Sequence, residues 1–214
     1  MAKTLYSLML SEDVVREVDK LAHRMGTNRS QLINSILAEY VGYTTPERRI
    51  NEILSNIERL LQPAQDLVPF LAPGAMSLSL KSALEYKYRP TVKYEVSLYQ
   101  GGGDPIGELN VLFRTQSEGL LSAMADFFRT WKAVEDAYFL PKGKQIDYAL
   151  YDGRFTRSIA APSKETDAEG LANALADYLH LFDRCMKLYV AGKYTPAEMQ
   201  RDYSNYLVKN LLYI

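Results

Sequence analysis

The chain has few of the residues that carry most covalent and metal chemistry. Its 214 residues include one cysteine, one tryptophan and two histidines. Because Cys185 has no partner thiol in the chain, an intramolecular disulfide is excluded, and we expect a reducing cytoplasm. No segment approaches the roughly 20 apolar residues of a membrane span. The apolar run at the N-terminus is short and followed at once by acidic residues, so we expect no cleavable signal.

An excess of charge of either sign is also missing. The chain carries 25 Lys and Arg residues against 26 Asp and Glu residues. This balance gives no global attraction to nucleic acid or to an anionic membrane, and we expect no membrane partner. A hydrophobic content of 47% is ample for a core, and the length fits one or two domains.

Recognisable catalytic or cofactor motifs are lacking too. His180, Asp183 and Cys185 lie near one another in the sequence, but they are too few and too weak to form a metal site. The GGGDP stretch at residues 101–105 lacks the Lys-Ser/Thr of a phosphate loop and is typical of a hairpin turn. Cys185 has no histidine base at a recognisable spacing, and no serine lies in a nucleophile elbow. We therefore expect no metal, no cofactor and no enzyme activity.

The N-terminal segment, KTLYSLML at residues 3–10, alternates as a short β-strand does. One face carries Tyr6, Leu8 and Leu10, and the other carries Lys3, Leu5, Ser7 and Met9. A strand of this length has no partner nearby in the chain, although its backbone N–H and C=O groups must be satisfied somewhere.

Two helices are predicted directly after this strand. Ser11 can cap the first helix and Gly26 ends it. Asn28, with Gln31 three residues later, forms a capping-box pattern for the second helix, which Gly42 ends. Apolar residues recur at helical spacing in both helices. Those expected to face a core are Val14, Val18, Leu21, Ala22, Met25, Leu32, Ile33, Ile36, Leu37 and Tyr40.

Residues 3–42 resemble the ribbon-helix-helix DNA-binding proteins of the CopG, Arc and MetJ type. The shared features are the strand ending in Leu10-Ser11-Glu12, the amphipathic helix, Met25-Gly26, the Asn28-Arg29-Ser30 start and the second apolar helix. The resemblance implies that the strand pairs with the same strand of a second chain. It also implies that the resulting antiparallel ribbon lies in the major groove of double-stranded DNA.

The resemblance further implies which residues contact DNA. The positions that would face the base edges are Leu5, Ser7 and Met9. The positions that would hold a phosphate, through backbone N–H groups and the helix dipole, are Asn28, Arg29 and Ser30. Residues 1–49 contain seven Lys and Arg residues and six Asp and Glu residues, a net charge of +1 per chain.

Residues 45–75 are predicted to form a linker helix and a proline-containing linker. Thr45 before Pro46 is a typical helix start, and an apolar stripe follows. Pro63, Pro69 and Pro73 then interrupt regular structure, which indicates a domain boundary.

A repeat is visible in residues 76–214. The stretch EGLLSAMADFF at 118–128 matches EGLANALADYL at 169–179, an offset of 169 − 118 = 51 residues. A sequence segment with strand-like alternation and a turn signal precedes each copy, and Asp152-Gly153 is the turn before the second copy. The pattern predicts a domain of two strand–strand–helix repeats with an antiparallel sheet, closed by a helix that starts at Thr195-Pro196. This domain resembles no family that we recognise.

The sequence therefore predicts an α+β fold. It comprises a ribbon-helix-helix domain at residues 1–44 that dimerises by strand exchange, the linker at 45–75 and the duplicated domain at 76–214. We expect a homodimeric, sequence-specific transcriptional regulator with a C-terminal domain that senses an effector or sets the oligomeric state. Two alternatives stay open. In one, the N-terminal fold only dimerises a protein-interaction or single-stranded nucleic-acid-binding module, for which exposed tyrosines would be suited. In the other, the chain is an antitoxin.

Overall fold

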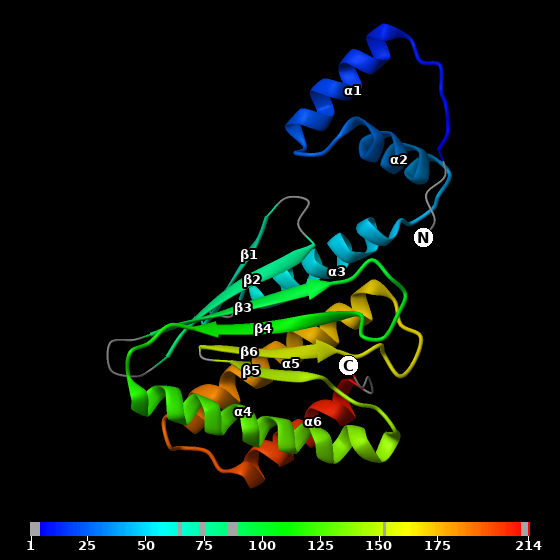
Figure 1. Cartoon of the computed structure of the whole chain (residues 1–214). Helices are drawn as coiled ribbons and strands as arrows, with labels where there is room; N and C mark the ends of the chain where they lie inside the picture. The colour runs from blue at the N-terminus through cyan, green and yellow to red at the C-terminus, as the bar shows by residue number, and fades with distance from the viewer. Residues whose placement is uncertain (1–4, 64–65, 73–75, 85–89, 152, 211–213) are drawn as a thin grey trace.

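The computed structural model of the chain is a mixed α+β structure in which helices accompany a six-stranded antiparallel sheet (Figure 1). It describes residues 5–63, 66–72, 76–84, 90–151, 153–210 and 214. The elements in chain order are α1 (Glu12–Arg24), α2 (Arg29–Tyr40), α3 (Pro46–Leu61), β1 (Leu67–Leu71), β2 (Ser77–Ala83), β3 (Thr91–Leu98), β4 (Gly107–Phe113), α4 (Glu118–Phe139), the 3₁₀ turn η1 (Leu140–Lys142), β5 (Tyr148–Tyr151), β6 (Arg154–Ile159), α5 (Ala168–Val190) and α6 (Pro196–Asn210). The predicted α+β class with an antiparallel sheet is confirmed.

The strands lie in the order β1-β2-β3-β4-β6-β5, and every neighbouring pair is antiparallel. The GGGDP stretch lies between β3 and β4, as the hairpin prediction requires. Gly153 begins the return from β5 to β6 with a φ of +68°. A Cβ atom there would lie 2.8 Å from the carbonyl oxygen of Phe113, so both the backbone angle and the space favour glycine. Asp152, the other half of this turn signal, lies outside the described residues.

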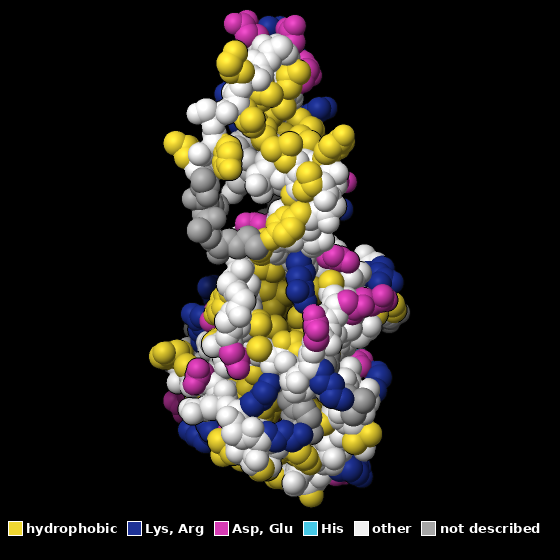
Figure 2. Space-filling model, turned by 90° about the vertical axis from the view of Figure 1, so that its right-hand side faces the viewer, with side chains coloured by type: hydrophobic (Ala, Val, Ile, Leu, Met, Phe, Trp, Pro, Cys, Tyr) yellow, Lys and Arg dark blue, Asp and Glu magenta, His cyan; other side chains and the backbone are white. Residues whose placement is uncertain are grey.

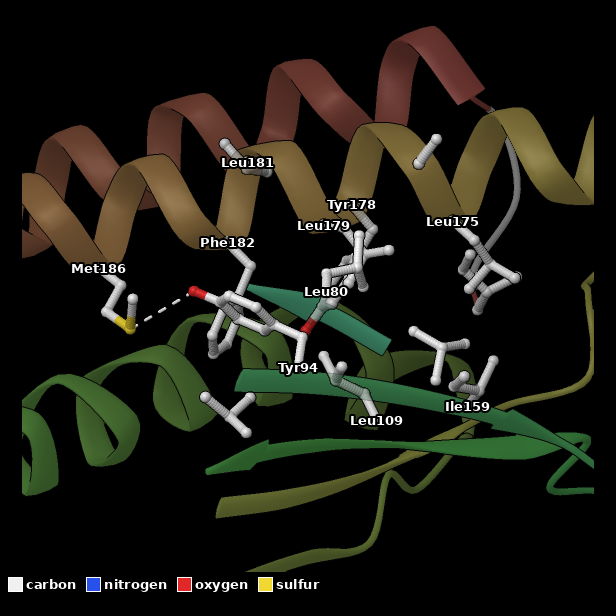
Figure 3. Close-up of a cluster of buried hydrophobic side chains, with 14 of the residues drawn as sticks. Leu80, Tyr94, Leu109, Ile159, Leu175, Tyr178, Leu179, Leu181, Phe182 and Met186 are labelled. Carbon is white, nitrogen blue, oxygen red and sulfur yellow. Dashed lines mark hydrogen bonds between the residues drawn. The ribbon is translucent and has the colours of Figure 1, made fainter. Parts of the chain in front are cut away.

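Helices α3, α4 and α5 supply the side chains that cover one face of the sheet. The alternate strand residues that point toward them are buried, as Figure 3 shows for Leu80, Tyr94 and Leu109 beneath α5. Tyr94 donates a hydrogen bond from its hydroxyl to Asp183 of α5 at 2.7 Å. Burial and this carboxylate raise the pKa of Tyr94 well above the ordinary value. The core therefore lies between the sheet and one layer of helices, and α6 packs against α4 and α5.

Helices α4 and α5, which contain the two matching stretches of sequence, bury large side chains at corresponding places. They are Phe127, Phe128 and Trp131 in α4, and Tyr178, Leu179 and Phe182 in α5. Phe128 stacks on Phe155 of β6 with ring centroids 4.4 Å apart, which places α4 on the same face of the sheet as α5. The element order strand–strand–helix occurs as β3-β4-α4 and again as β5-β6-α5. That the two runs are duplicated copies stays a prediction.

Helix α3 is part of the core rather than a connection between domains. The sequence predicts a linker over residues 45–75, but the apolar stripe of α3 is buried with the sheet, and the members of that stripe are Ile50, Ile53, Leu54, Ile57 and Leu61. Residues 67–71 form the edge strand β1. The linker interpretation is wrong for these elements, because five apolar side chains on one helical face need a surface to cover them. Residues 64–65 and 73–75 lie outside the described residues.

A charged group is buried where α4, β6 and α6 meet. Arg157 of β6 pairs with Glu135 of α4, with Nη2 and Oε1 2.9 Å apart and both side chains inaccessible to solvent. The hydroxyls of Tyr148 and Tyr203 donate to the same carboxylate at 2.7 and 3.2 Å. Arg157 Nη2 also donates to a main-chain oxygen of Ile214 at 2.6 Å. Burial alone would lower the pKa of Arg157, but the charge of Glu135 holds it well above the ordinary value.

Helices α1 and α2 pack on each other at one end of the molecule, away from the sheet (Figure 1). The capping predictions hold in part. Asn28 accepts a hydrogen bond from the backbone N–H of Gln31 at 3.0 Å, whereas Ser11 occupies the N-cap of α1 without a side-chain bond. Among the described residues, none of the helices is long and apolar enough to cross a membrane.

Candidate nucleic-acid interface

The segment predicted to form the DNA-reading strand is not a strand within one chain. Residues 5–10 have no strand assignment and pair with no other described segment, while residues 1–4 lie outside the described part. The physical reason is that a β-ladder needs a partner, and all six described strands belong to the distant sheet. The ribbon between two chains therefore stays a prediction.

The side chains of this segment are open to solvent in the single chain. Leu5 and Met9, two of the three predicted base-contacting residues, are essentially fully exposed, and Ser7 between them is exposed as well. Tyr6 and Leu8 on the opposite face are also exposed, by 82% and 59%. Within one chain this second face is therefore not covered by the helices.

The two N-terminal helices leave most of their apolar surface uncovered. Only Ala22, Leu32 and Ala38 are buried among the described residues of α1 and α2. The large hydrophobic side chains that remain exposed in and beside these helices are Val14, Met25, Ile36, Leu37, Tyr40, Val41 and Tyr43. Figure 2 shows hydrophobic side chains gathered over this upper part of the molecule. The predicted burial is confirmed for Ala22 and Leu32 and reached only in part by Val18, Leu21 and Ile33. It is wrong for the exposed members of both stripes in the single chain, because each helix has only the other to cover it.

The N-terminus of α2 presents the predicted phosphate-contacting residues together. Asn28 caps the helix, and Arg29 and Ser30 form its exposed first turn, which contains no acidic residue. The N–H groups of a first turn have no acceptor within their own helix, and the helix dipole adds partial positive charge there. The geometry can therefore accept an anion at the backbone of Arg29 and Ser30.

The side chain of Arg29 is engaged elsewhere. Its Nε and Nη2 donate to the two carboxylate oxygens of Asp19 on α1, at 2.6 and 2.5 Å. This hydrogen-bonded pair lowers the pKa of Asp19 and raises the pKa of Arg29. Both side chains are about half exposed, and such exposed pairs contribute little net stability, so an incoming phosphate can compete for the guanidinium.

Other cations of the region are paired in the same way. Arg16 lies 3.3 Å from Asp13, and Lys20 lies 2.7 Å from Glu17, both on the exposed surface of α1. Arg48 at the start of α3 lies 3.9 Å from Glu39 of α2. The positive charge available to a DNA backbone is therefore modest unless these pairs rearrange.

Sequence reasoning missed the role of Asp19, because ten residues separate it from Arg29 and only the packing of α1 on α2 joins them. It also singled out Asp183 as a weak ligand candidate. Asp183 instead lies in the core, where it accepts from Tyr94 and pairs with Lys187 at 2.7 Å. Burial raises the pKa of the Cys185 thiol to about 11. The described residues contain no group of three or more His, Cys, Asp or Glu side chains placed to hold a metal ion.

Comparisons with protein-family models, with curated proteins and with solved structures found no match to this chain.

Proposed function

We propose that the chain is a homodimeric, sequence-specific transcriptional regulator that binds double-stranded DNA through residues 5–42. The observation that carries this proposal is the apolar surface that the single chain leaves uncovered on residues 5–10, α1 and α2. Contiguous exposed apolar patches of this kind mark interaction sites.

A second copy of the same segment is the partner that fits this surface. Two extended segments placed antiparallel would satisfy each other's backbone groups, which no other described segment of the single chain does. Tyr6, Leu8 and Leu10 of the ribbon would then pack against the exposed residues of the four helices. Burying one large aliphatic side chain contributes about 1.5–3 kcal/mol, so several such residues per chain suffice for a stable dimer.

The dimer would present Leu5, Ser7 and Met9 of both chains on one face of the ribbon. Leu5 and Met9 carry no hydrogen-bonding group, so they can contact only apolar parts of the bases such as thymine methyl groups. Ser7 is the one hydrogen-bonding side chain of the three, and in this proposal it carries most of the base readout.

Affinity in this proposal comes mainly from the two α2 N-termini. Each would hold a phosphate at the backbone of Arg29 and Ser30, with the guanidinium of Arg29 leaving Asp19 to join it. The C-terminal domain would sense an effector or set the oligomeric state.

The experiment is fluorescence anisotropy with duplexes from the chain's own genomic locus and with scrambled duplexes, across a salt series. Arg29→Ala should weaken binding to all duplexes alike. It should also flatten the log–log salt slope by about 2, because each of the two Arg29 side chains in the dimer neutralises one phosphate. Ser7→Ala should mainly relax sequence preference, at a cost of about 1–3 kcal/mol for each good hydrogen bond to a base that it removes.

Arg201→Ala provides the matched control, since Arg201 is an exposed arginine on α6 and lies outside the proposed interface. It should leave the slope unchanged. If wild-type protein shows no salt-dependent binding to any duplex, DNA recognition must be abandoned for the interpretation in which the N-terminal fold only dimerises the chain. An unchanged slope for Arg29→Ala would show that Arg29 does not hold a phosphate.

A further inference from the structure

The face of the sheet opposite the helices carries a second candidate site. On β2, β3 and β6, the strand residues that point away from the core are exposed or half-exposed, whereas their neighbours along each strand are buried. Of the described helices, those that pack on the sheet lie on its other face. This open face is therefore a solvent-accessible platform built on a rigid core.

One row of residues crosses this face through all six strands. Its members are aligned by strand register, and in order from β1 to β5 they are Val68, Lys81, Lys93, Leu112, Arg154 and Tyr151. Because neighbouring strands lie about 4.8 Å apart, the row extends about 24 Å across the sheet. It places three cations in one line between an apolar and an aromatic end.

Two of these cations directly oppose each other. Lys81 of β2 is the register partner of Lys93 of β3, and like charges in such a pair destabilise a sheet. Lys93 is partly compensated by Glu95, whose carboxylate lies 3.5 Å away. Lys81 forms no ion pair with any acidic residue in the described part of the chain. The pair accordingly favours an anion bound above the sheet.

The third cation is held in position by the neighbouring row. Asn110 of β4, only 5% exposed, accepts hydrogen bonds from Arg154 Nε and Nη2 at 3.0 and 2.6 Å and from Thr156 at 2.8 Å. Asn110 in turn donates to Glu108 at 2.8 Å, which also accepts from Tyr99. Arg154 is thus fixed on the sheet surface while its side chain stays accessible to solvent.

Exposed aromatic rings stand at both edges of the same face. Tyr151 of β5 is 65% exposed at the end of the row, and Phe70 of β1 is 68% exposed in the adjacent row, opposite Ser79. Large aromatic side chains left this exposed on rigid strands suit stacking with flat ligands. Cations between two aromatic rings are the combination that binds a backbone of phosphates carrying unpaired bases.

We propose that this face binds single-stranded nucleic acid, with Lys81, Lys93 and Arg154 holding phosphates and Phe70 and Tyr151 stacking on bases. The occupant is single-stranded because a duplex keeps its bases stacked inside and offers no ring to the two aromatic side chains. This site is separate from the N-terminal segment proposed to bind duplex DNA, and neither proposal depends on the other.

The test uses the full-length chain and a labelled oligothymidylate of about 12 nucleotides, within the range of site sizes of such platforms. Anisotropy across a salt series should show binding. The double variant Lys81→Ser, Lys93→Ser should reduce the slope by about 1.4, since single strands contribute about 0.7 per phosphate contact. The matched control, Lys164→Ser with Lys193→Ser, removes two exposed lysines outside this face and should leave the slope unchanged.

Substitution of the aromatic side chains distinguishes the binding of nucleic acid from the binding of other polyanions. Phe70→Ala and Tyr151→Ala should each weaken oligothymidylate binding about tenfold and leave binding of inorganic polyphosphate unchanged. Arg29→Ala should not alter oligothymidylate binding, which distinguishes this site from the N-terminal one. Circular dichroism melts check that each surface variant folds.

Three results would overturn the proposal. The first is that oligothymidylate does not bind at low salt. The second is that replacing the control pair of lysines reduces the salt slope as much as replacing Lys81 and Lys93 does. In the third, polyphosphate binds as well as the oligonucleotide and neither aromatic substitution matters, which would assign the row to polyanions or acidic protein segments in general.

Discussion

Replacing Glu135 with glutamine should destabilise the chain strongly, because it removes the carboxylate that pairs with the buried charge of Arg157. Glu135 accepts hydrogen bonds from Arg157, Tyr148 and Tyr203, and the other groups around Arg157 are main-chain oxygens of Ser158 and Ile214 and aromatic rings. Glutamine keeps an oxygen for the tyrosines, so the main change is the loss of one negative charge.

The expected magnitude follows from this burial. Breaking one side of a buried ion pair costs about 3–5 kcal/mol. For a chain of this size each kcal/mol lowers the melting temperature by about 2–4 °C, so the midpoint should fall by about 6–20 °C. Urea denaturation followed by circular dichroism would give the free energy of unfolding directly.

The double variant Glu135→Gln, Arg157→Met tests whether the loss of stability comes from the charge of Arg157. Removing both charges eliminates the uncompensated cation, so the double variant should be more stable than Glu135→Gln alone although it carries an additional substitution. Exposed Glu52→Gln serves as the control and should change stability by less than about 0.5 kcal/mol. A cost below about 1 kcal/mol for Glu135→Gln, or a double variant less stable than the single one, would refute the reasoning.

Three further predictions concern other parts of the chain. Leu8→Pro should abolish the N-terminal dimer, since proline removes a backbone N–H donor of the β-ladder and the packing side chain of leucine. Analytical ultracentrifugation should then show monomers, and a fully dimeric variant would contradict the ribbon. Asp19→Asn should increase duplex affinity a few-fold for all sequences by releasing Arg29, and an unchanged affinity in anisotropy would show that their pairing does not limit binding. The pKa of buried Tyr94 is raised, so the tyrosine ionises in the unfolded chain first as the pH rises, and the stability of the fold should decline above about pH 10. In urea titrations at these pH values, Tyr94→Phe should lessen the decline by about 1.4 kcal/mol per pH unit. An equal decline in the variant and the wild type would show that Tyr94 does not contribute.

Local sequence signals predicted the secondary structure well where a short-range physical cause exists. Asn28 caps α2, Thr45 caps α3, and Thr195 and Glu198 form a reciprocal capping box at the start of α6. The left-handed backbone of Gly153 likewise follows from a turn that only a few residues can form. These features depend on neighbours within four residues, so a single sequence contains them.

Features that depend on tertiary packing were not predictable in the same way. The prolines after α3 indicated a linker, yet β1 contains Pro69 as an edge strand, where a missing N–H is tolerated. The burial of Arg157 with Glu135 joins positions 22 residues apart, and the row through Lys81 and Lys93 exists only once the strand register is known. The apolar residues of the N-terminal segment show the opposite case: their pattern is visible in the sequence, but the burial that it predicts is not provided by one chain.

The most direct test of the proposed regulator is DNase footprinting on the DNA upstream of its own coding sequence, with wild-type protein and with Leu8→Pro. A ribbon formed by two chains predicts a protected site with twofold-related half-sites, and Leu8→Pro should abolish this protection. Absence of any protected site at protein concentrations where the chain is dimeric, or equal protection by Leu8→Pro, would contradict the account.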